Sequence, residues 1–241
     1  MDTQSSGLSA RTADAIPFPL GCPAPHVIPT PYAMQEQPQP SRYGLKLLDV
    51  APHHRVLDMY GSGRQRMSMI SDELDERGEL VANISGALSL ESVSLRHTPD
   101  NVTMTRLGDE RLLPQEMGAF DRVLLDIPAV IGRHQSPRQR CERLVSLLLR
   151  AIKLCREGGR VVYMTHGHST QSNEMVIDQV LNDAHKGVAL HNITLSGVIG
   201  RPAGTCHGGQ QLDPRIARAV HVMDCVDGDE QFMAVFECGQ S

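Results

Sequence analysis

The sequence predicts an α/β fold, with a mostly parallel, doubly wound sheet and an antiparallel C-terminal strand. From Leu45 onward, apolar runs of strand length alternate with stretches whose apolar residues recur at helical spacing. This alternation is typical of helices that cover both faces of a parallel sheet. The last two apolar runs, Val220 to Val226 and Gln231 to Glu237, are joined by a short polar link, which predicts an antiparallel pair.

The expected elements follow the chain in order. Strands are expected at residues 55–59, 80–84, 102–107, 121–126, 160–164 and 189–195. Helices are expected at residues 67–74, 88–96, 141–152 and 173–184. The third helix has the widest apolar stripe, and Lys153 and Arg156 lie near its end, where the helix dipole favours cations. Gly158 and Gly159 are expected to close it, because glycine adopts left-handed dihedrals at little cost.

The chain divides by composition into an arm and one domain. Residues 1–45 are rich in proline, which removes backbone donors and favours extended conformations, so this segment is expected to be an extended arm. Residues 46–241 form the expected domain. Asp2 and Asp14 against a lone Arg11 are a poor match to an organelle presequence. Either there is no presequence or it has already been removed.

Composition excludes several classes of function. A formal charge of -5 and a pI of about 6.1 argue against gripping nucleic acid by bulk charge alone, so RNA binding would need a local basic patch. No apolar run has the length of a membrane span, and no membrane partner is expected. The six cysteines form no C-x-x-C pair, so neither a metal site nor a disulfide framework is expected. With 3% aromatic residues, the core is expected to be aliphatic.

Candidate ligand-binding residues fall where parallel strands end. Gly61 and Gly63 follow the first strand, and Asp58, Asp109 and Asp126 lie at or just past the carboxyl ends of three strands. Glycines there let a nucleoside cofactor approach the backbone at the head of a helix, and the carboxylates could bind ribose or amine groups. A plain tight turn and ordinary capping explain the same residues. Together they indicate one cleft at the carboxyl edge.

Two histidines follow the strand at 160–164. His166 and His168 could supply a general base or half of a metal site, but no third ligand stands at a diagnostic spacing. Hydrogen-bonded or surface histidines are the favoured interpretation.

One dense basic stretch precedes the third helix. Its members are Arg133, His134, Arg138, Arg140 and Arg143. They could form a phosphate-contacting loop beside the cleft, or simply the solvated start of a helix.

Three motifs carry a resemblance to a known family. They are DRVLLDIP at 121–128, GGRVVYMT at 158–165 and STQSNE at 169–174. In this order they resemble the Sun-domain family of RNA 5-methylcytosine methyltransferases, from about Leu45 to the end of the chain. The DIP motif and the RHQS that begins at Arg133 are most similar to the mitochondrial rRNA-modifying branch. The resemblance implies a class I S-adenosylmethionine-dependent, Rossmann-like methyltransferase fold. It also implies ribosomal RNA, assembly factors or ribosomal proteins, or a helical-repeat protein, as partners, and a mitochondrial location.

The chain departs from this family at both motif cysteines. The cysteine that attacks cytosine C6 is replaced by His166, and the cysteine that helps release the product is replaced by Ala129. Covalent catalysis of this kind needs a thiolate, which neither side chain can provide. No catalytic residue is therefore expected in this chain.

The cofactor loop departs as well. Residues 60–66 read YGSGRQR where the family has CAAPGGK, and Asn83 stands where an acid would bind the ribose. Asparagine lacks the charge-assisted strength of a carboxylate. Asp109 and Asp126 occupy matching positions, so the resemblance leaves S-adenosylmethionine binding open.

Three functions follow from these residues. The first is a catalytically inactive, RNA-contacting factor in ribosome assembly. The second is an active methyltransferase that transfers a methyl group to nitrogen or oxygen, with Asp126 or His166 as base. The third is a protein-interaction module whose proline-rich arm lies along a partner, without RNA binding.

Overall fold

The computed structural model describes residues 40–61, 64–84, 100–105, 119–129, 131–132, 134–183, 187–223 and 230–239. The expected helix at 88–96 and the arm before residue 40 lie outside these ranges. So do three candidate site residues, Gly63, Asp109 and Arg133.

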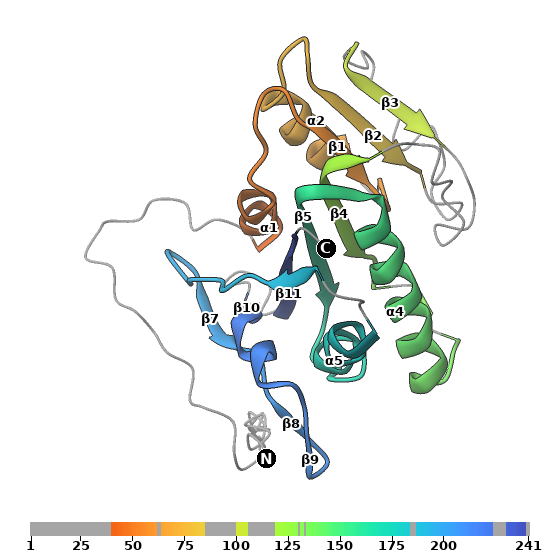
Figure 1. The fold of residues 1–241 in the computed structure, drawn as a ribbon, viewed down its shortest axis with the longest axis vertical. Helices are drawn as coiled ribbons and strands as arrows, with labels where there is room; N and C mark the ends of the chain where they lie inside the picture. Colours follow the sequence, from red (N-terminus) through yellow and green to blue (C-terminus); the bar gives the residue numbers. More distant parts are fainter. Residues whose placement is uncertain are drawn as a thin grey trace, which may run out of the picture.

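In the part of the chain that the structure describes, a mixed nine-stranded sheet organises the fold (Figure 1). The parallel strands are β1 (Arg55–Asp58), β2 (Glu79–Asn83), β3 (Val102–Thr105), β4 (Phe120–Ile127) and β5 (Cys155–His166), in the order β3-β2-β1-β4-β5. The antiparallel part continues with β11 (Glu230–Cys238), β10 (Val220–Met223) and β7 (Ile199–Pro202), while β6 (Val188–Leu190) pairs with β11. Both the mostly parallel sheet and the antiparallel finish predicted from the sequence are confirmed.

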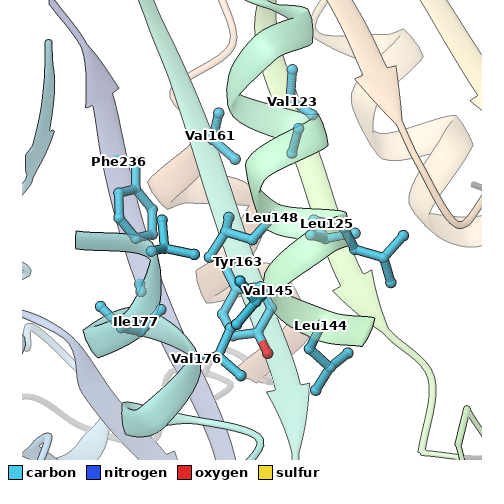
Figure 2. Packing of buried hydrophobic residues seen from close by; sticks show 14 of the residues in the cluster. Val123, Leu125, Leu144, Val145, Leu148, Val161, Tyr163, Val176, Ile177 and Phe236 are labelled. Carbon is cyan, nitrogen blue, oxygen red and sulfur yellow. The ribbon is translucent and has the colours of Figure 1, made fainter. Parts of the chain in front are cut away.

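Helices cover both faces of this sheet. Among the described residues, α1 (Pro40–Leu48) and α2 (Arg64–Asp72) lie on one face, and α4 (Pro137–Leu154) and α5 (Glu174–Asp183) lie on the other. A 3-10 helix, η3 (Pro214–Arg218), packs beside α5, and a small hairpin joins β8 (Cys206–His207) to β9 (Gln210–Gln211). Alternate residues of one strand therefore enter different cores. Val161 and Tyr163 pack under α4 and α5 (Figure 2), whereas Val162 packs on the side of α1. A strand buried on both faces reads as a continuous apolar run.

Helix α4 begins with a capping box. Ser136 accepts a hydrogen bond from the Gln139 backbone N–H, the Gln139 side chain accepts one from the Ser136 backbone, and Pro137 occupies the first turn. The helix ends at Leu154, because Cys155 is already extended.

The expectation that Gly158 and Gly159 close this helix was wrong. Both lie in β5, at an irregularity in its pairing with β4. Gly158 has a φ of 73°, and a Cβ on Gly159 would lie 2.9 Å from the backbone oxygen of Asp121. The two glycines let β5 bend against β4, which local sequence signals do not distinguish from a helix end.

Two further expectations changed. Strand β6 covers only the first two residues of the expected strand at 189–195 and begins one residue earlier, at Val188. Ile193 turns into the core beside α1 instead. Strand β7 was not predicted. The core is not aliphatic throughout, because Phe120, Tyr163 and Phe232 are among its largest fully buried side chains.

Helix α1 crosses the predicted boundary at residue 45. Tyr43 is buried, and its hydroxyl donates a 2.9 Å hydrogen bond to the Thr194 carbonyl. Leu48 is also buried in the same core. The last residues of the predicted arm thus pack with the domain.

None of the described helices combines the length and apolarity that a bilayer span requires.

Candidate functional site

Three polar side chains lie buried where parallel strands end. Asp58 closes β1, Asn83 closes β2, and Asp126 is near the end of β4. Since β2, β1 and β4 are neighbours, the topology brings these predicted residues to one edge of the sheet. Asp58, Asn83 and Asp126 of the predicted cofactor-binding residues thus lie at one edge of the sheet, whereas Gly63 and Asp109 are outside the described residues.

Asp58 is a buried carboxyl group with one oxygen that accepts no hydrogen bond. Its Oδ1 accepts a 3.2 Å hydrogen bond from the Tyr60 backbone N–H, while Oδ2 is buried without a hydrogen-bond partner. Burial raises the pKa of Asp58 to about 6, Asp126 adds to the rise, and Arg66 and the Tyr60 N–H oppose it. A ligand that donates a hydrogen bond or a positive charge would satisfy this oxygen.

Asp126 is held between a cation and an imidazole. Arg66 of α2 forms an ion pair with Asp126 Oδ2, and His166 Nε2 lies 3.3 Å from Asp126 Oδ1. Burial alone would raise the pKa of Asp126, but the hydrogen bond from His166 and the charge of Arg66 outweigh it, and the pKa is lowered. Asp126 is thus an ionised group that orients the partly exposed ring of His166. The arginine was not expected in this role.

Gly61 is packed against β2. A Cβ there would lie 2.9 Å from Ile84 Cδ1 and 3.2 Å from Ala82 Cβ. Asn83 Nδ2 donates a 3.3 Å hydrogen bond to the Met59 carbonyl and ties the turn to the same strand. Close packing therefore explains the glycine without a ligand, while the turn still presents its backbone at the carboxyl edge.

The segment after β5 is fixed by its own motif residues. Thr165 Oγ1 donates a 2.5 Å hydrogen bond to Asn173 Oδ1, and Asn173 Nδ2 donates a 3.0 Å bond to the Gly167 carbonyl. The Tyr163 hydroxyl donates a 2.6 Å bond to the Ser172 carbonyl. These bonds set the position of His166. This structural role of Tyr163, Thr165 and Asn173 was not predicted from the sequence, where their motifs carried only the family resemblance.

A buried ion cluster stands next to this segment. His221 Nε2 lies 2.7 Å from Glu174 Oε1, and His221 Nδ1 contacts Glu230 Oε1. Arg201 Nη2 and His168 Nδ1 lie 2.9 Å and 2.5 Å from the two Glu230 oxygens. Burial would lower the pKa of His221, but its two carboxylate partners outweigh burial, and the pKa is raised. His221 was not predicted from the sequence, since Glu174 lies 47 residues away along the chain.

The basic stretch is found at the start of α4. His134 and Arg138 are exposed, and Arg140 is half-buried. Arg138 Nε lies 2.9 Å from Glu142 Oε1 one turn later, a pairing typical of a solvated helix start.

His166 and His168 each pair with a carboxylate, in agreement with the favoured interpretation. Among residues that the structure describes, no three His, Cys, Asp or Glu side chains gather as metal ligands.

A family model described as 16S rRNA methyltransferase RsmB/F matches residues 45–214. The chain belongs to the RsmB/F family. The resemblance to RNA cytosine methyltransferases is thus confirmed at the level of the family. Its motifs lie in β4, in β5 and in the turn that ends at the first residue of α5.

Curated relatives of this RsmB/F chain include two mammalian proteins. The mouse 28S rRNA (cytosine-C(5))-methyltransferase is 34% identical over 158 residues, and the human 28S rRNA (cytosine(4447)-C(5))-methyltransferase is 32% identical over 158 residues. Each match covers 57% of this chain and 20% of the relative. The chain therefore matches about a fifth of the length of these relatives.

Solved structures share the fold. A methyltransferase homolog from Pyrococcus horikoshii superposes with a TM-score of 0.65 at 20% identity, covering 87% of this chain and 73% of the other. NSun6 from Pyrococcus horikoshii, solved with SFG, gives 0.59 at 19% identity, covering 84% and 52%. These structures support the class I methyltransferase fold of the RsmB/F chain.

Four cysteines of this RsmB/F chain are described. Cys141 is buried on α4, and Cys155 and Cys238 lie at the start of β5 and the end of β11, the other end of these strands from His166. Cys206 is exposed in the β8–β9 hairpin. At the two motif positions stand Ala129, which is exposed, and His166.

Proposed function

We propose that this chain is a catalytically inactive member of the rRNA methyltransferase family that binds ribosomal RNA during ribosome assembly. Membership of the family supports the choice of RNA. The resemblance of the DIP and RHQS motifs to the mitochondrial branch is our reason for proposing mitochondria, and assembly factors, ribosomal proteins or a helical-repeat protein as partners.

The observation that carries this proposal is the environment of His166. The imidazole is held by Asp126, and Asp126 by Arg66. An imidazole fixed against a carboxylate is a base or a hydrogen-bond donor, but it cannot replace the thiolate that adds to cytosine C6 and later leaves. Because Ala129 occupies the second motif position, the chain lacks both the cysteine that attacks cytosine C6 and the cysteine that helps release the product.

Cofactor binding involves other residues than the two replaced cysteines. Asp58 Oδ2 is a buried acceptor without a partner, and Gly61 presents backbone at the same edge, so these residues fit S-adenosylmethionine. We propose Asp58, Gly61, Gly63, Asn83, Asp109 and Asp126 as the residues that hold it. When bound, this cofactor supplies an electrophilic methyl group. Asn83 and the ion-paired Asp126 offer weaker acceptors than free carboxylates, so we expect weak binding.

A methylation and trapping assay tests inactivity. The chain is incubated with radiolabelled S-adenosylmethionine and rRNA, and in parallel with RNA that contains 5-fluorocytidine, which traps a C6 adduct. We expect neither 5-methylcytosine nor a covalent adduct. Cys206→Ser, which removes an exposed thiol, is the control that shows whether an observed adduct forms at Cys206. Formation of 5-methylcytosine by the unaltered chain would overturn the proposal.

The contact between Asp126 and His166 favours a second candidate function. A histidine oriented by a buried carboxylate could act as a general base, as needed for methyl transfer to nitrogen or oxygen. This alternative predicts tight S-adenosylmethionine binding by calorimetry and methyl transfer to RNA, both lost in His166→Ala. Weak binding without transfer supports the inactive factor instead.

RNA binding separates our proposal from a protein-interaction module. We propose Arg133, His134, Arg138 and Arg140 as phosphate contacts, although Arg138 is also paired to Glu142. Replacing Arg133, Arg138 and Arg140 with alanine should weaken RNA binding and flatten its salt dependence by roughly one counterion per lost contact.

A matched control variant removes three positive charges at other positions. Lys46, Arg77 and Lys153 are exposed cations at the opposite end of the parallel strands, and their alanine variant should bind RNA like the unaltered chain. Equal binding by both triple variants would overturn the phosphate-loop assignment. No RNA binding by the unaltered chain would favour the interaction module.

A further inference from the structure

The β8–β9 hairpin is a folded element that buries none of its own residues. Cys206 pairs with Gln211 and His207 with Gln210, and all six residues from 206 to 211 are exposed. Gly208 and Gly209, with φ of 57° and 83°, form its tip. A Cβ added at either glycine would meet no atom within 4 Å. The hairpin thus adds nothing to the described core.

Its base, in contrast, is firmly attached. Ala203 and Leu212 on either side are buried in the core under α4 and α5, and the Leu212 N–H donates a 2.9 Å hydrogen bond to the Thr205 carbonyl. The Asp213 N–H donates a 2.7 Å bond to Asp178 on α5. A hairpin anchored in this way is presented in one orientation rather than as a loose loop.

The attachment also places it beside the candidate site. The Gly204 N–H donates a 3.3 Å hydrogen bond to Glu174 Oε1, and Glu174 begins α5 directly after the segment that carries His166. Figure 1 shows the hairpin projecting past α5, at the end of the molecule toward which the β5 arrow points. RNA that brings a nucleotide to His166 would therefore pass near this hairpin.

The side chains of the hairpin indicate the kind of partner. They are a thiol, an imidazole and two amides, with no formal charge and no large apolar group. A protein interface needs aromatic or aliphatic anchors, which are absent from these six residues. Amides and imidazole suit unstacked RNA bases, which proteins recognise by stacking and by hydrogen bonds to base edges.

We propose that the β8–β9 hairpin contacts single-stranded RNA next to the candidate site. His207 stacks on a base, and Gln210 and Gln211 hydrogen-bond to base edges, while the glycine tip lets the backbone come close. This inference rests on the proposed RNA binding and deepens it. It assigns base contacts to the hairpin and phosphate contacts to the start of α4.

Binding measurements separate the two kinds of contact. We expect the variant His207→Ala/Gln210→Ala/Gln211→Ala to bind a short mixed-sequence single-stranded RNA roughly tenfold more weakly, from the loss of stacking and edge contacts. Its salt dependence should be unchanged, because no phosphate contact is lost. His53→Ala/Thr103→Ala, at exposed positions away from the carboxyl edge, is the control and should bind normally. Unchanged affinity of the hairpin variant, or an altered salt slope, would overturn the inference.

Cross-linking gives an independent result. A photoreactive maleimide on Cys206, in a chain with Cys22→Ser and Cys225→Ser, should cross-link to the single-stranded RNA. The same label on Glu76→Cys in a Cys206→Ser background should not, since Glu76 is exposed between α2 and β2, away from the hairpin. RNA that binds but gives no link from Cys206 contradicts the hairpin contact alone. No RNA binding by the unaltered chain contradicts both this inference and the proposed function.

Discussion

His221 Nε2 lies 2.7 Å from Glu174 Oε1, in the interior of the protein and across 47 residues of chain. The contact joins β10 to the first residue of α5, and the other ring nitrogen contacts Glu230 at the start of β11. One imidazole thus links the antiparallel part of the sheet to the segment that follows β5. Both carboxylates have lowered pKa values, because His221 outweighs their burial.

Replacing this imidazole should destabilise the protein in a pH-dependent way. His221→Gln leaves the buried carboxylate of Glu174 without its cation, while Glu230 keeps its contact with Arg201. We expect a loss of about 3 kcal/mol near pH 6. A raised histidine pKa stabilises the fold fully below the unfolded value and loses this effect as pH rises through the folded value. The deficit should therefore shrink in alkaline solution, as measured by urea unfolding across pH. A constant deficit would show that the imidazole acts only through packing.

Asp58→Asn should have the opposite effect on stability. Because burial raises the pKa of Asp58 from 3.8 to about 6, ionising it in the folded state costs about 3 kcal/mol, and stability falls as pH rises between roughly 4 and 6. The amide removes this cost, so the variant should melt higher at pH 7.5 and gain little at pH 4. Calorimetry on the same variant should show weaker S-adenosylmethionine binding. A lower melting temperature at pH 7.5 would contradict this assignment.

Tyr163→Phe tests the support of the segment that carries His166. The substitution removes the 2.6 Å hydrogen bond to the Ser172 carbonyl inside the core, and we expect a loss of roughly 1–2 kcal/mol in unfolding free energy. Amide exchange should also quicken in residues 165–173. Tyr43→Phe is the control, since it removes a hydroxyl bond on the other face of the sheet and should leave that segment unchanged.

Gly61→Ala tests the packing of the turn after β1. The added methyl group would press on Ile84 and Ala82 of the β2 segment, and we expect a cost of about 1–3 kcal/mol from overpacking. Gly167→Ala is a useful contrast, because its added Cβ would meet nothing within 4 Å, although its φ of 97° strains any side chain. If Gly61→Ala melts like the unaltered protein, then the turn is looser than the structure describes.

Much of the fold could be predicted because its signals are local. The apolar run from Val123 to Ile127 and the helical stripe of α4 follow from spacing along the chain, and a parallel sheet then places Asp58 and Asp126 at one edge. The arrangement of Gly158 and Gly159 could not be predicted. A left-handed glycine can end a helix or bend a strand, and only the neighbouring strand β4 decides between them.

By itself, the sequence determined the alternation of strands and helices, the edge at which polar side chains gather, and the presence of His166 and Ala129 at the motif positions. The tertiary structure alone decided which charges meet: Arg66 with Asp126, and His221 with Glu174. Side-chain pairing depends on distances between elements that lie tens of residues apart. Hydrophobic spacing carries no information about those distances, because it records only which face of each element is buried.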